Sequence, residues 1–263
     1  MRVLESLVFS ALLLAGSVGE AQNIFTVAGI PYTHRQSVDS QPALMAPLGS
    51  VYGLLAGKLS GRVLFNDESL VVELQPGGSL LVRAGLGPQL NPLAQLLTPA
   101  ARFGASSAFP ASILQPGILR GMAEDSTGAL YVSDAAFGAV YRIGLDGTVT
   151  LFAGRGTKAD SEGQPATSAQ LASPRGLVFD SKGNLDIAEV FCNCIHQVTP
   201  DGIIHTLYTA PPLPVAPRIA NIEGLAIDGA DNLYFTEWFG NVVVRVAADG
   251  TAATIAGTGS AGF

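Results

Sequence analysis

One set of spacings recurs three times in this chain without an insertion or deletion, and it restricts the fold more than any other feature. In each copy a glycine, an acid, a second acid and an Asp-Gly pair are separated by 4, 9 and 12 residues. The copies start at Gly121, Gly176 and Gly224. Self-similarity at a period of about 50 residues is the signature of a repeat architecture.

Each copy contains four short apolar runs between Gly, Asp and Asn turn signals, and it leaves no room for a helix. In the second copy these runs predict strands at about 177–179, 185–188, 195–198 and 203–208. Short strands at even spacing, broken by turns, are typical of closed or radial all-β folds. Four strands per copy make one blade of a β-propeller.

A fainter fourth copy precedes these three. The segment "GRVLFNDESLVVELQPGGSLLVRAG" places Asp67 where the next copy has Asp134, although it is two residues shorter before its following turn. Its first strand also lacks the turn aspartate of the other copies. We therefore expect four blades, at about 47–85, 118–154, 173–209 and 221–257.

The blade segments, the link "GQPATSAQLASPRGLVFDSKGNL" and the endings "TLFAG" and "TIAG" resemble secreted bacterial proteins with NHL repeats. The resemblance covers nearly all of residues 24–263 and is strongest in 155–257. It implies a six-bladed propeller that presents loops to protein, nucleic-acid or small-molecule partners. It implies little about chemistry, because propellers carry many unrelated functions.

The two ends of the chain predict an incomplete six-bladed ring. The segment "NIFTVAG" at 23–29 has the pattern of an outer strand, which in a closed propeller completes the last blade. The last blade already has an outer strand at 251–256, so outer strands outnumber the sets of inner strands. We infer that the sequence is truncated or that the missing blades come from elsewhere. A compact four-bladed closure is the alternative.

The N-terminus predicts export from the cell. Arg2 precedes an apolar stretch from Leu7 to Ala15, and Gly19 and Ala21 supply the small residues of a cleavage site. Residues 1–21 are therefore assigned to a signal peptide, with an uncleaved membrane anchor as the alternative. No later stretch of the sequence is long and apolar enough to span a bilayer. We expect residues 22–263 to be secreted or periplasmic.

Charge argues against nucleic acid as a partner. Without residues 1–21 the chain has 13 basic and 19 acidic residues and no basic cluster. Phosphate binding needs a concentrated positive face. We therefore expect a protein partner or a small-molecule or glycan ligand.

Residues 86–117 form a long link rich in Pro, Ala, Ser and Leu. Loops of this length are uncommon in compact domains and often carry function. We expect the link to lie over one face of the propeller, and a lid or a partner-binding loop is the alternative.

Acidic side chains recur at two positions of the repeat. Asp67, Asp134, Glu189 and Glu237 share one position, and a ring of carboxylates could bind calcium. In proteins with NHL repeats, however, this acid caps the turn after the second strand by accepting backbone N–H groups, each such bond contributing about 1.5–3 kcal/mol. A residue that stabilises the blade is expected in every copy of the repeat, whereas a functional site normally differs from one copy to the next. We therefore assign structural turn roles to Asp134, Glu189 and Glu237, and to Asp125, Asp180 and Asp228.

The run Cys192-Asn193-Cys194-Ile195-His196 departs from the repeat. Cys and His at this spacing can bind zinc or copper, but tetrahedral zinc needs four ligands and the other histidines, His34 and His205, lie elsewhere. A disulfide suits an oxidising compartment, although residues two apart seldom meet its geometry without strain. Reduced or strained structural cysteines are the preferred interpretation, ahead of the disulfide and of a metal site at Cys192, Cys194 and His196.

Three further residues are candidate binding residues. Asp186 stands where the neighbouring blades have tyrosine, and a buried carboxylate is costly unless it is paired. It could pair with Arg175, mark a ligand site or reflect drift of the repeat. Trp238 and Phe239 occupy a turn, and exposed aromatic residues are favoured as interface anchors.

The sequence contains no motif for nucleophilic or zinc-dependent catalysis. The inner strands, taken as 122–124, 177–179 and 225–227, supply one ionisable residue, Glu124, which is too few for a channel metal. We predict a non-catalytic propeller that acts as a protein- or ligand-binding scaffold and needs no cofactor. The alternatives are a metal-dependent propeller hydrolase or lyase resembling lactonases, and a truncated fragment without independent function.

Overall fold

The computed structural model describes residues 48, 50–57, 61–67, 69–85, 108–111, 114, 116–157, 162–211 and 221–261. The expected signal peptide, the outer strand at 23–29 and most of the link at 86–117 lie outside these residues. Within the described residues, no helix is long and apolar enough to cross a bilayer.

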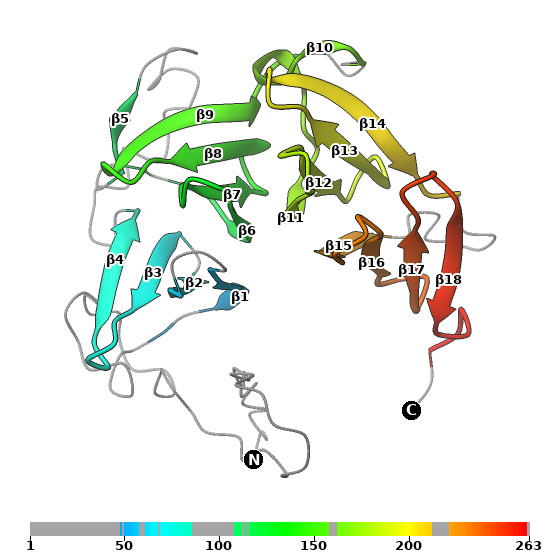
Figure 1. The fold of residues 1–263 in the computed structure, drawn as a ribbon, viewed down its shortest axis with the longest axis horizontal. Helices are drawn as coiled ribbons and strands as arrows, with labels where there is room; N and C mark the ends of the chain where they lie inside the picture. The colour runs from blue at the N-terminus through cyan, green and yellow to red at the C-terminus, as the bar shows by residue number, and fades with distance from the viewer. Residues whose placement is uncertain are drawn as a thin grey trace, which may run out of the picture.

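The structure confirms an all-β fold built from four blades of four antiparallel strands (Figure 1). The first blade comprises β1 (Val51–Ala56), β2 (Val63–Asp67), β3 (Leu70–Leu74) and β4 (Leu80–Ala84). The second comprises β6 (Leu119–Glu124), β7 (Leu130–Asp134), β8 (Ala139–Ile143) and β9 (Thr148–Gly154). The third comprises β11 (Pro174–Phe179), β12 (Leu185–Glu189), β13 (Cys194–Val198) and β14 (Ile203–Thr209). The fourth comprises β15 (Ile222–Ile227), β16 (Leu233–Glu237), β17 (Val242–Val246) and β18 (Ala252–Ala256).

Short segments extend the two middle blades at their outer edges. Strand β5 (Phe109–Pro110) pairs with β9, and β10 (Gln164–Pro165) pairs with β14 and is followed by the 3₁₀ turn η4 (Ala166–Ser168). These pairings cover the outer strands of the second and third blades. The outer strands of the first and fourth blades have no such addition among the described residues.

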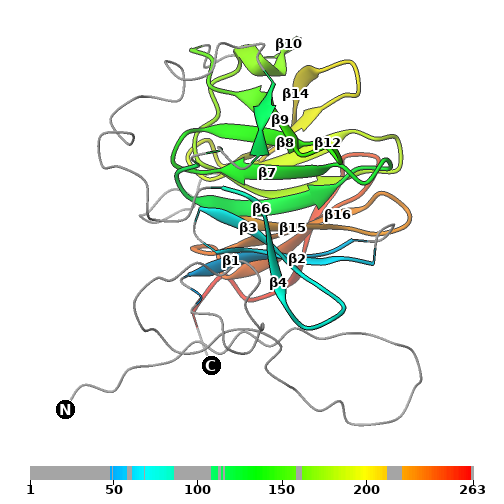
Figure 2. The same ribbon diagram turned by 90° about the vertical axis from the view of Figure 1, so that its left-hand side faces the viewer.

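The blades follow one another around a common axis, with the first strand of each blade innermost (Figures 1 and 2). Strand β1 contacts β6, β6 contacts β11, and β11 contacts β15. No comparable contact joins β15–β18 to β1–β4 within the described part of the chain, and all residues of β18 are exposed. Among the described residues the four blades form an arc around the axis, and the expected completion to six blades stays a prediction.

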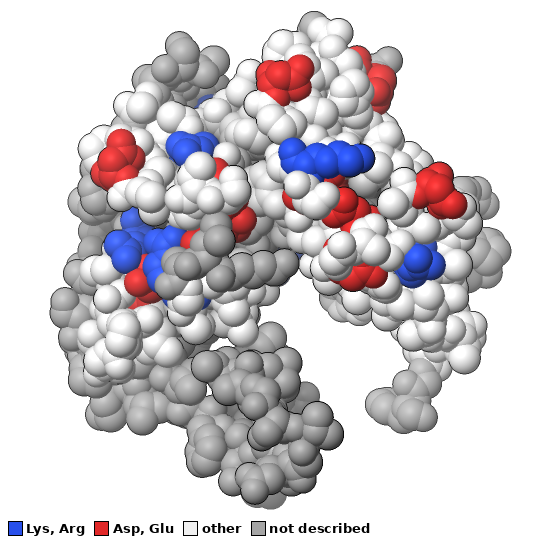
Figure 3. Space-filling model, in the orientation of Figure 1, with Lys and Arg blue, Asp and Glu red and all other residues white. Residues whose placement is uncertain are grey.

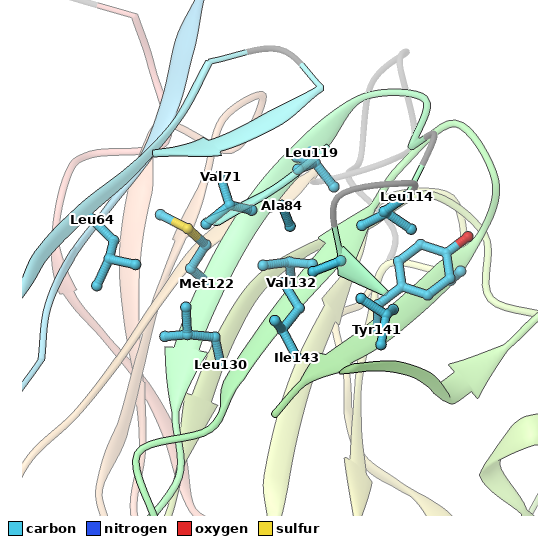
Figure 4. Packing of buried hydrophobic residues seen from close by; sticks show 13 residues of the cluster. Leu64, Val71, Ala84, Leu114, Leu119, Met122, Leu130, Val132, Tyr141 and Ile143 are labelled. Carbon is cyan, nitrogen blue, oxygen red and sulfur yellow. The ribbon is translucent and has the colours of Figure 1, made fainter. Parts of the chain in front are cut away.

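The hydrophobic core is divided among the blade interfaces. Side chains of β2 and β3 meet side chains of β6 and β7 between the first two blades (Figure 4). Leu64, Leu119 and Val132 are fully buried there. Separate clusters fill the second and third interfaces. Burial of each large apolar side chain contributes about 1.5–3 kcal/mol, so neighbouring blades stabilise one another.

Every inner strand has the same irregularity near its start. The register of β6 against β7 shifts between Leu119 and Met122, and corresponding shifts occur in the other three blades. Such bulges are frequent next to functional sites because they redirect side chains. Each bulge contains one larger residue followed by a glycine. These four larger residues make up the candidate functional site described below.

Candidate functional site

The bulges place four non-glycine residues at corresponding points of the inner strands, Tyr52, Arg120, Arg175 and Glu223. Each follows a residue that pairs with the acid at the end of the second strand, as Leu119 pairs with Asp134. Because the inner strands of successive blades lie side by side, residues about 50–70 positions apart become neighbours. We call these four residues the axial set.

Members of the axial set interact in sequence around the arc. The guanidinium carbon of Arg120 lies 3.7 Å from the centre of the Tyr52 ring, which is a cation–π contact. In the next pair of blades, Arg175 Nη1 lies 3.0 Å from Glu223 Oε2. The axial set therefore contains two guanidinium groups and one carboxylate, and its net charge is positive.

Both arginines have a hydrogen-bond donor without an acceptor among the described residues. The Nε atoms of Arg120 and Arg175 are buried and have no hydrogen-bond partner among the described residues. Burial lowers the pKa of Arg175 below its ordinary value, and the neighbouring charge of Arg120 lowers this pKa further, while Glu223 opposes the shift. Buried donors without partners are costly.

The glycines and two polar side chains hold the axial set in place. A Cβ atom on Gly121 would lie 2.1 Å from the carbonyl oxygen of Arg175, so only glycine allows the two inner strands to approach this closely. Ser133 Oγ accepts the N–H of Gly121 at 2.8 Å and donates to the Arg175 carbonyl at 2.6 Å. In the first blade, Asn66 accepts the N–H of Gly53 and donates to the Arg120 carbonyl in the same way.

The sequence-based search missed the axial set. The inner strands were expected to begin at 122, 177 and 225, but they begin at 119, 174 and 222. The prediction of a single ionisable residue on these strands was therefore wrong. Glu124, which that prediction named, forms an ion pair with Arg62 at 2.7 Å. The dipeptides Tyr-Gly, Arg-Gly, Arg-Gly and Glu-Gly at equivalent positions are the signal that could have revealed the set.

Asp186 lies in a second location, between the third and fourth blades. It is 2% exposed and borders a pocket of about 210 Å³ that strands and turns of both blades line. Asp186 Oδ1 accepts a hydrogen bond from Gln197 Nε2 at 2.9 Å, so the pairing with Arg175 that we considered does not occur. Burial raises the pKa of Asp186 to about 7, with smaller contributions from the charges of Asp180 and Asp231. The carboxyl can therefore accept or release a proton near neutral pH.

The pocket has a structural cause in the repeat. In the second blade the corresponding residue, Tyr131, packs edge-on against Phe152 and Phe179 at the blade interface. A carboxylate at this position fills much less volume than a tyrosine ring, and the interface between the third and fourth blades is correspondingly open. The candidate binding residue Asp186 is thus placed at a cavity, and its role in binding stays a prediction.

Four of the recurrent acids accept several backbone hydrogen bonds each. Asp125, Asp180 and Asp228 each accept the N–H groups of the residues two and four positions later, at 2.8–3.0 Å. Asp134 accepts four backbone N–H groups, from Gly117, Ile118, Ala136 and Phe137. These hydrogen bonds are of the kind that a structural turn role requires, and that role stays a prediction.

Cys192 and Cys194 form a disulfide in this structure, which was the second of the three interpretations considered. Beside it, His196 Nε2 lies 3.3 Å from Cys194 Sγ and 3.1 Å from Glu189 Oε1. Burial alone would lower the pKa of His196, but the hydrogen bond to Glu189 and its charge raise this pKa above its ordinary value.

Trp238 and Phe239 lie in the turn between β16 and β17 as a parallel stack, with ring centres 5.5 Å apart. Their exposed fractions are 65% and 46%. Phe191, in the corresponding turn of the third blade, is 68% exposed. Acidic and basic side chains are interspersed over the face of the molecule shown in Figure 3, without a large area of one sign.

No protein-family model matches the sequence, and no curated protein matches it. Solved structures do match. Virginiamycin B lyase from Staphylococcus aureus has a TM-score of 0.53 at 18% identity over 81% of this chain and 57% of its own. Regucalcin from Agrobacterium tumefaciens, a calcium-binding protein, has a TM-score of 0.50 at 13% identity over 79% of this chain and 60% of its own. A luciferin-regenerating enzyme has a TM-score of 0.50 at 13% identity over 81% of this chain and 64% of its own.

At these identities the likeness supports the β-propeller fold alone. The chain spans less than two thirds of the length of each of these three structures. All three share the fold while their names indicate different activities, which agrees with the general independence of propeller fold and chemistry.

Proposed function

We propose that this propeller binds a small anionic molecule at its axis through Arg120 and Arg175. The observation that carries the proposal is the pair of buried Nε atoms that no acceptor of the described residues satisfies. A guanidinium group donates two parallel hydrogen bonds to a carboxylate or a phosphate, and such charge-assisted bonds are among the strongest in proteins.

The other two members of the axial set shape the site. Tyr52 holds the guanidinium of Arg120 by its ring face, which leaves the guanidinium edge available for an anion. The negative charge of Glu223 balances the positive charge of Arg175 only. No carboxylate among the described residues forms an ion pair with Arg120, so the charge of Arg120 is not balanced in this way. A carboxylate-bearing or phosphate-bearing ligand would therefore restore charge balance. This proposal corresponds to the ligand-binding scaffold predicted from the sequence.

An enzyme is the second candidate function, and the similarity to virginiamycin B lyase favours it. The axial set does not fit a bound divalent metal, however. Calcium takes six to eight oxygen ligands, whereas the axial set offers one carboxylate, Glu223, and that carboxylate already pairs with Arg175. Within the axial set, Tyr52, Glu223 and the two arginines are the side chains that could take part in catalysis.

The remaining features of the proposal rest on the sequence. The blade pattern supports repeats of the NHL type, and the apolar N-terminal stretch supports export to the periplasm or the exterior. The acidic balance and the lack of a basic cluster in the sequence support a partner other than nucleic acid.

Isothermal titration calorimetry with citrate and with inorganic phosphate tests anion binding. Arg120→Ala and Arg175→Ala should each weaken binding at least tenfold, because each removes a charge-assisted hydrogen bond of about 1.5–3 kcal/mol. Arg142→Ala is the matched control, since Arg142 lies on β8 near Asp125 and away from the axial set. Equal losses in all three variants would contradict an axial site.

Quinupristin accompanies a catalytically inactive virginiamycin B lyase in a solved structure that also matches this chain. Incubation of the protein with quinupristin, followed by chromatography and mass spectrometry, therefore tests the second candidate function. Conversion that is lost in Arg175→Ala and kept in Arg142→Ala would support an enzyme at the axis. Anion binding without conversion would favour the scaffold.

A further inference from the structure

The third blade breaks the repeat at one place, where four potential metal ligands meet. Glu189 ends β12, and Cys194, its cross-strand partner, begins β13. His196 lies two residues further along the same face of β13, and Cys192 lies in the turn that joins the two strands. One ligand atom from each of these residues lies within 4.8 Å of all the others.

Glu189 differs from the corresponding acid of the second blade in how its oxygens are used. Asp134 accepts four backbone N–H groups. Glu189 Oε2 accepts the N–H of Ala172, whereas Oε1 faces His196 and has no other partner among the described residues. Glu189 is 1% exposed. A buried carboxylate oxygen therefore points into the group of sulfur and nitrogen atoms and away from the backbone.

The other blades lack this ligand set although they keep the acid. The positions of Cys192, Cys194 and His196 are occupied by Phe137, Ala139 and Tyr141 in the second blade, and by Gly240, Val242 and Val244 in the fourth. None of these six residues offers a usual zinc ligand. A repeated structural role accounts for the acid in every blade, but it does not account for three additional ligands in one blade.

We propose that the reduced form of the third blade binds one Zn²⁺ ion through Glu189, Cys192, Cys194 and His196. Zinc takes four ligands in tetrahedral arrangement, and thiolate, imidazole and carboxylate groups are its usual ligands in proteins. The fourth ligand, which the cysteine and histidine spacing did not supply, is the buried Glu189. Thr206 Oγ1 lies 3.5 Å from His196 Nδ1, on the ring side opposite Nε2, and it can orient the imidazole.

The disulfide makes this site dependent on reduction. A phosphine reductant breaks the S–S bond and takes up one oxygen from water as phosphine oxide, and the two cysteines receive two electrons and two protons to become thiols. Each thiol then loses its proton when its sulfur binds zinc. The Cα atoms of Cys192 and Cys194 are 5.2 Å apart, a separation that lets both sulfurs bind one ion. Cys192 is exposed, so the reductant and the ion can reach the site.

Cobalt substitution tests the proposal in the purified protein. Co²⁺ is added with and without prior reduction by tris(2-carboxyethyl)phosphine, and the absorption spectrum is recorded under anaerobic conditions. We expect a thiolate-to-cobalt charge-transfer band at one equivalent of Co²⁺ in the reduced protein, its loss on addition of Zn²⁺, and no band in the oxidised protein. Circular dichroism before the addition of metal checks that the reduced protein is folded.

Variants identify the ligands. Cys194→Ser should abolish the band, and Glu189→Gln should weaken Co²⁺ binding tenfold or more, since loss even of an outer partner of a ligand costs about 10–100-fold. Glu237→Gln is the matched control at the same position of the fourth blade. Should Glu189→Gln fail to fold, His196→Gln replaces it, with His205→Gln as its control. Unfolding on reduction, absence of the band, or equal effects of the test and control variants would overturn the proposal.

Discussion

The hydroxyl of Ser133 in the second blade donates to the carbonyl oxygen of Arg175 in the third blade, at 2.6 Å. The same hydroxyl accepts the N–H of Gly121, so one side chain satisfies backbone groups of two neighbouring inner strands. Asn66 forms the equivalent bridge between the first and second blades. At the third interface this position is Ala188, which cannot form a bridge.

Replacement of Ser133 by alanine should lower the free energy of unfolding by about 1–3 kcal/mol, because it leaves a donor and an acceptor at a blade interface without their partner. Urea unfolding measures the loss. Thr236→Val is the control, since Thr236 accepts only the N–H of Gly224, at 3.3 Å. A loss in Thr236→Val as large as in Ser133→Ala would show that the bridge between blades has no special weight.

Gly121→Ala and Gly224→Ala form a matched pair. A Cβ atom at position 121 would lie 2.1 Å from the Arg175 carbonyl oxygen, whereas at position 224 its nearest neighbour would be Thr236 Oγ1 at 3.6 Å. We expect Gly121→Ala to destabilise the protein by about 1–3 kcal/mol or more through the forced shift of the strands. Gly224→Ala should stay within about 0.5 kcal/mol of the original protein. Thermal unfolding compares the two, and similar melting temperatures would contradict the close approach of β6 and β11.

Asp186 should make stability depend on pH. Its folded pKa of about 7 lies above the ordinary value of 3.8, so the folded state binds more protons than the unfolded state between these two values. The free energy of unfolding should therefore fall as the pH rises from about 4 to above 7, by at most about 4 kcal/mol, since one pKa unit corresponds to about 1.4 kcal/mol.

Asp186→Asn should flatten this part of the profile, because asparagine does not titrate. Urea unfolding at a series of pH values measures both proteins. Asp146→Asn is the control, since Asp146 is exposed and lies outside the pocket. An unchanged slope in Asp186→Asn would mean that other groups cause the dependence.

Trp238 is the single tryptophan of the chain, and its ring is largely exposed beside Phe239. Iodide should quench its fluorescence in the folded protein nearly as efficiently as in urea. Trp238→Ala should lower the free energy of unfolding by no more than about 1 kcal/mol, because the stack with Phe239 is the main interaction that the substitution removes. Strong protection from iodide would instead place Trp238 in an interface, as expected if copies of the chain associate through this turn.

The strands of each blade were predictable because their signals are local. The alternation of residues 185–188 identified β12, and the Asp-Gly pairs at 146, 201 and 249 marked the turns before the outer strands. The starts of the inner strands were not predictable in this way. A bulge interrupts the alternation of side chains at Arg120 and Arg175. The regular apolar pattern therefore begins three residues after the first residue of each strand.

The chain's repeat determined by itself that the protein is an all-β propeller with four blades, because strand and turn preferences act over a few residues and recur at fixed spacing. Only the tertiary structure decided which residues of different blades meet. Arg120 contacts Tyr52, and Arg175 pairs with Glu223, although the partners lie about 50–70 positions apart in the sequence. The pocket beside Asp186 lies between surfaces of two blades. Such contacts depend on how the blades pack around the axis, and no local pattern encodes that packing.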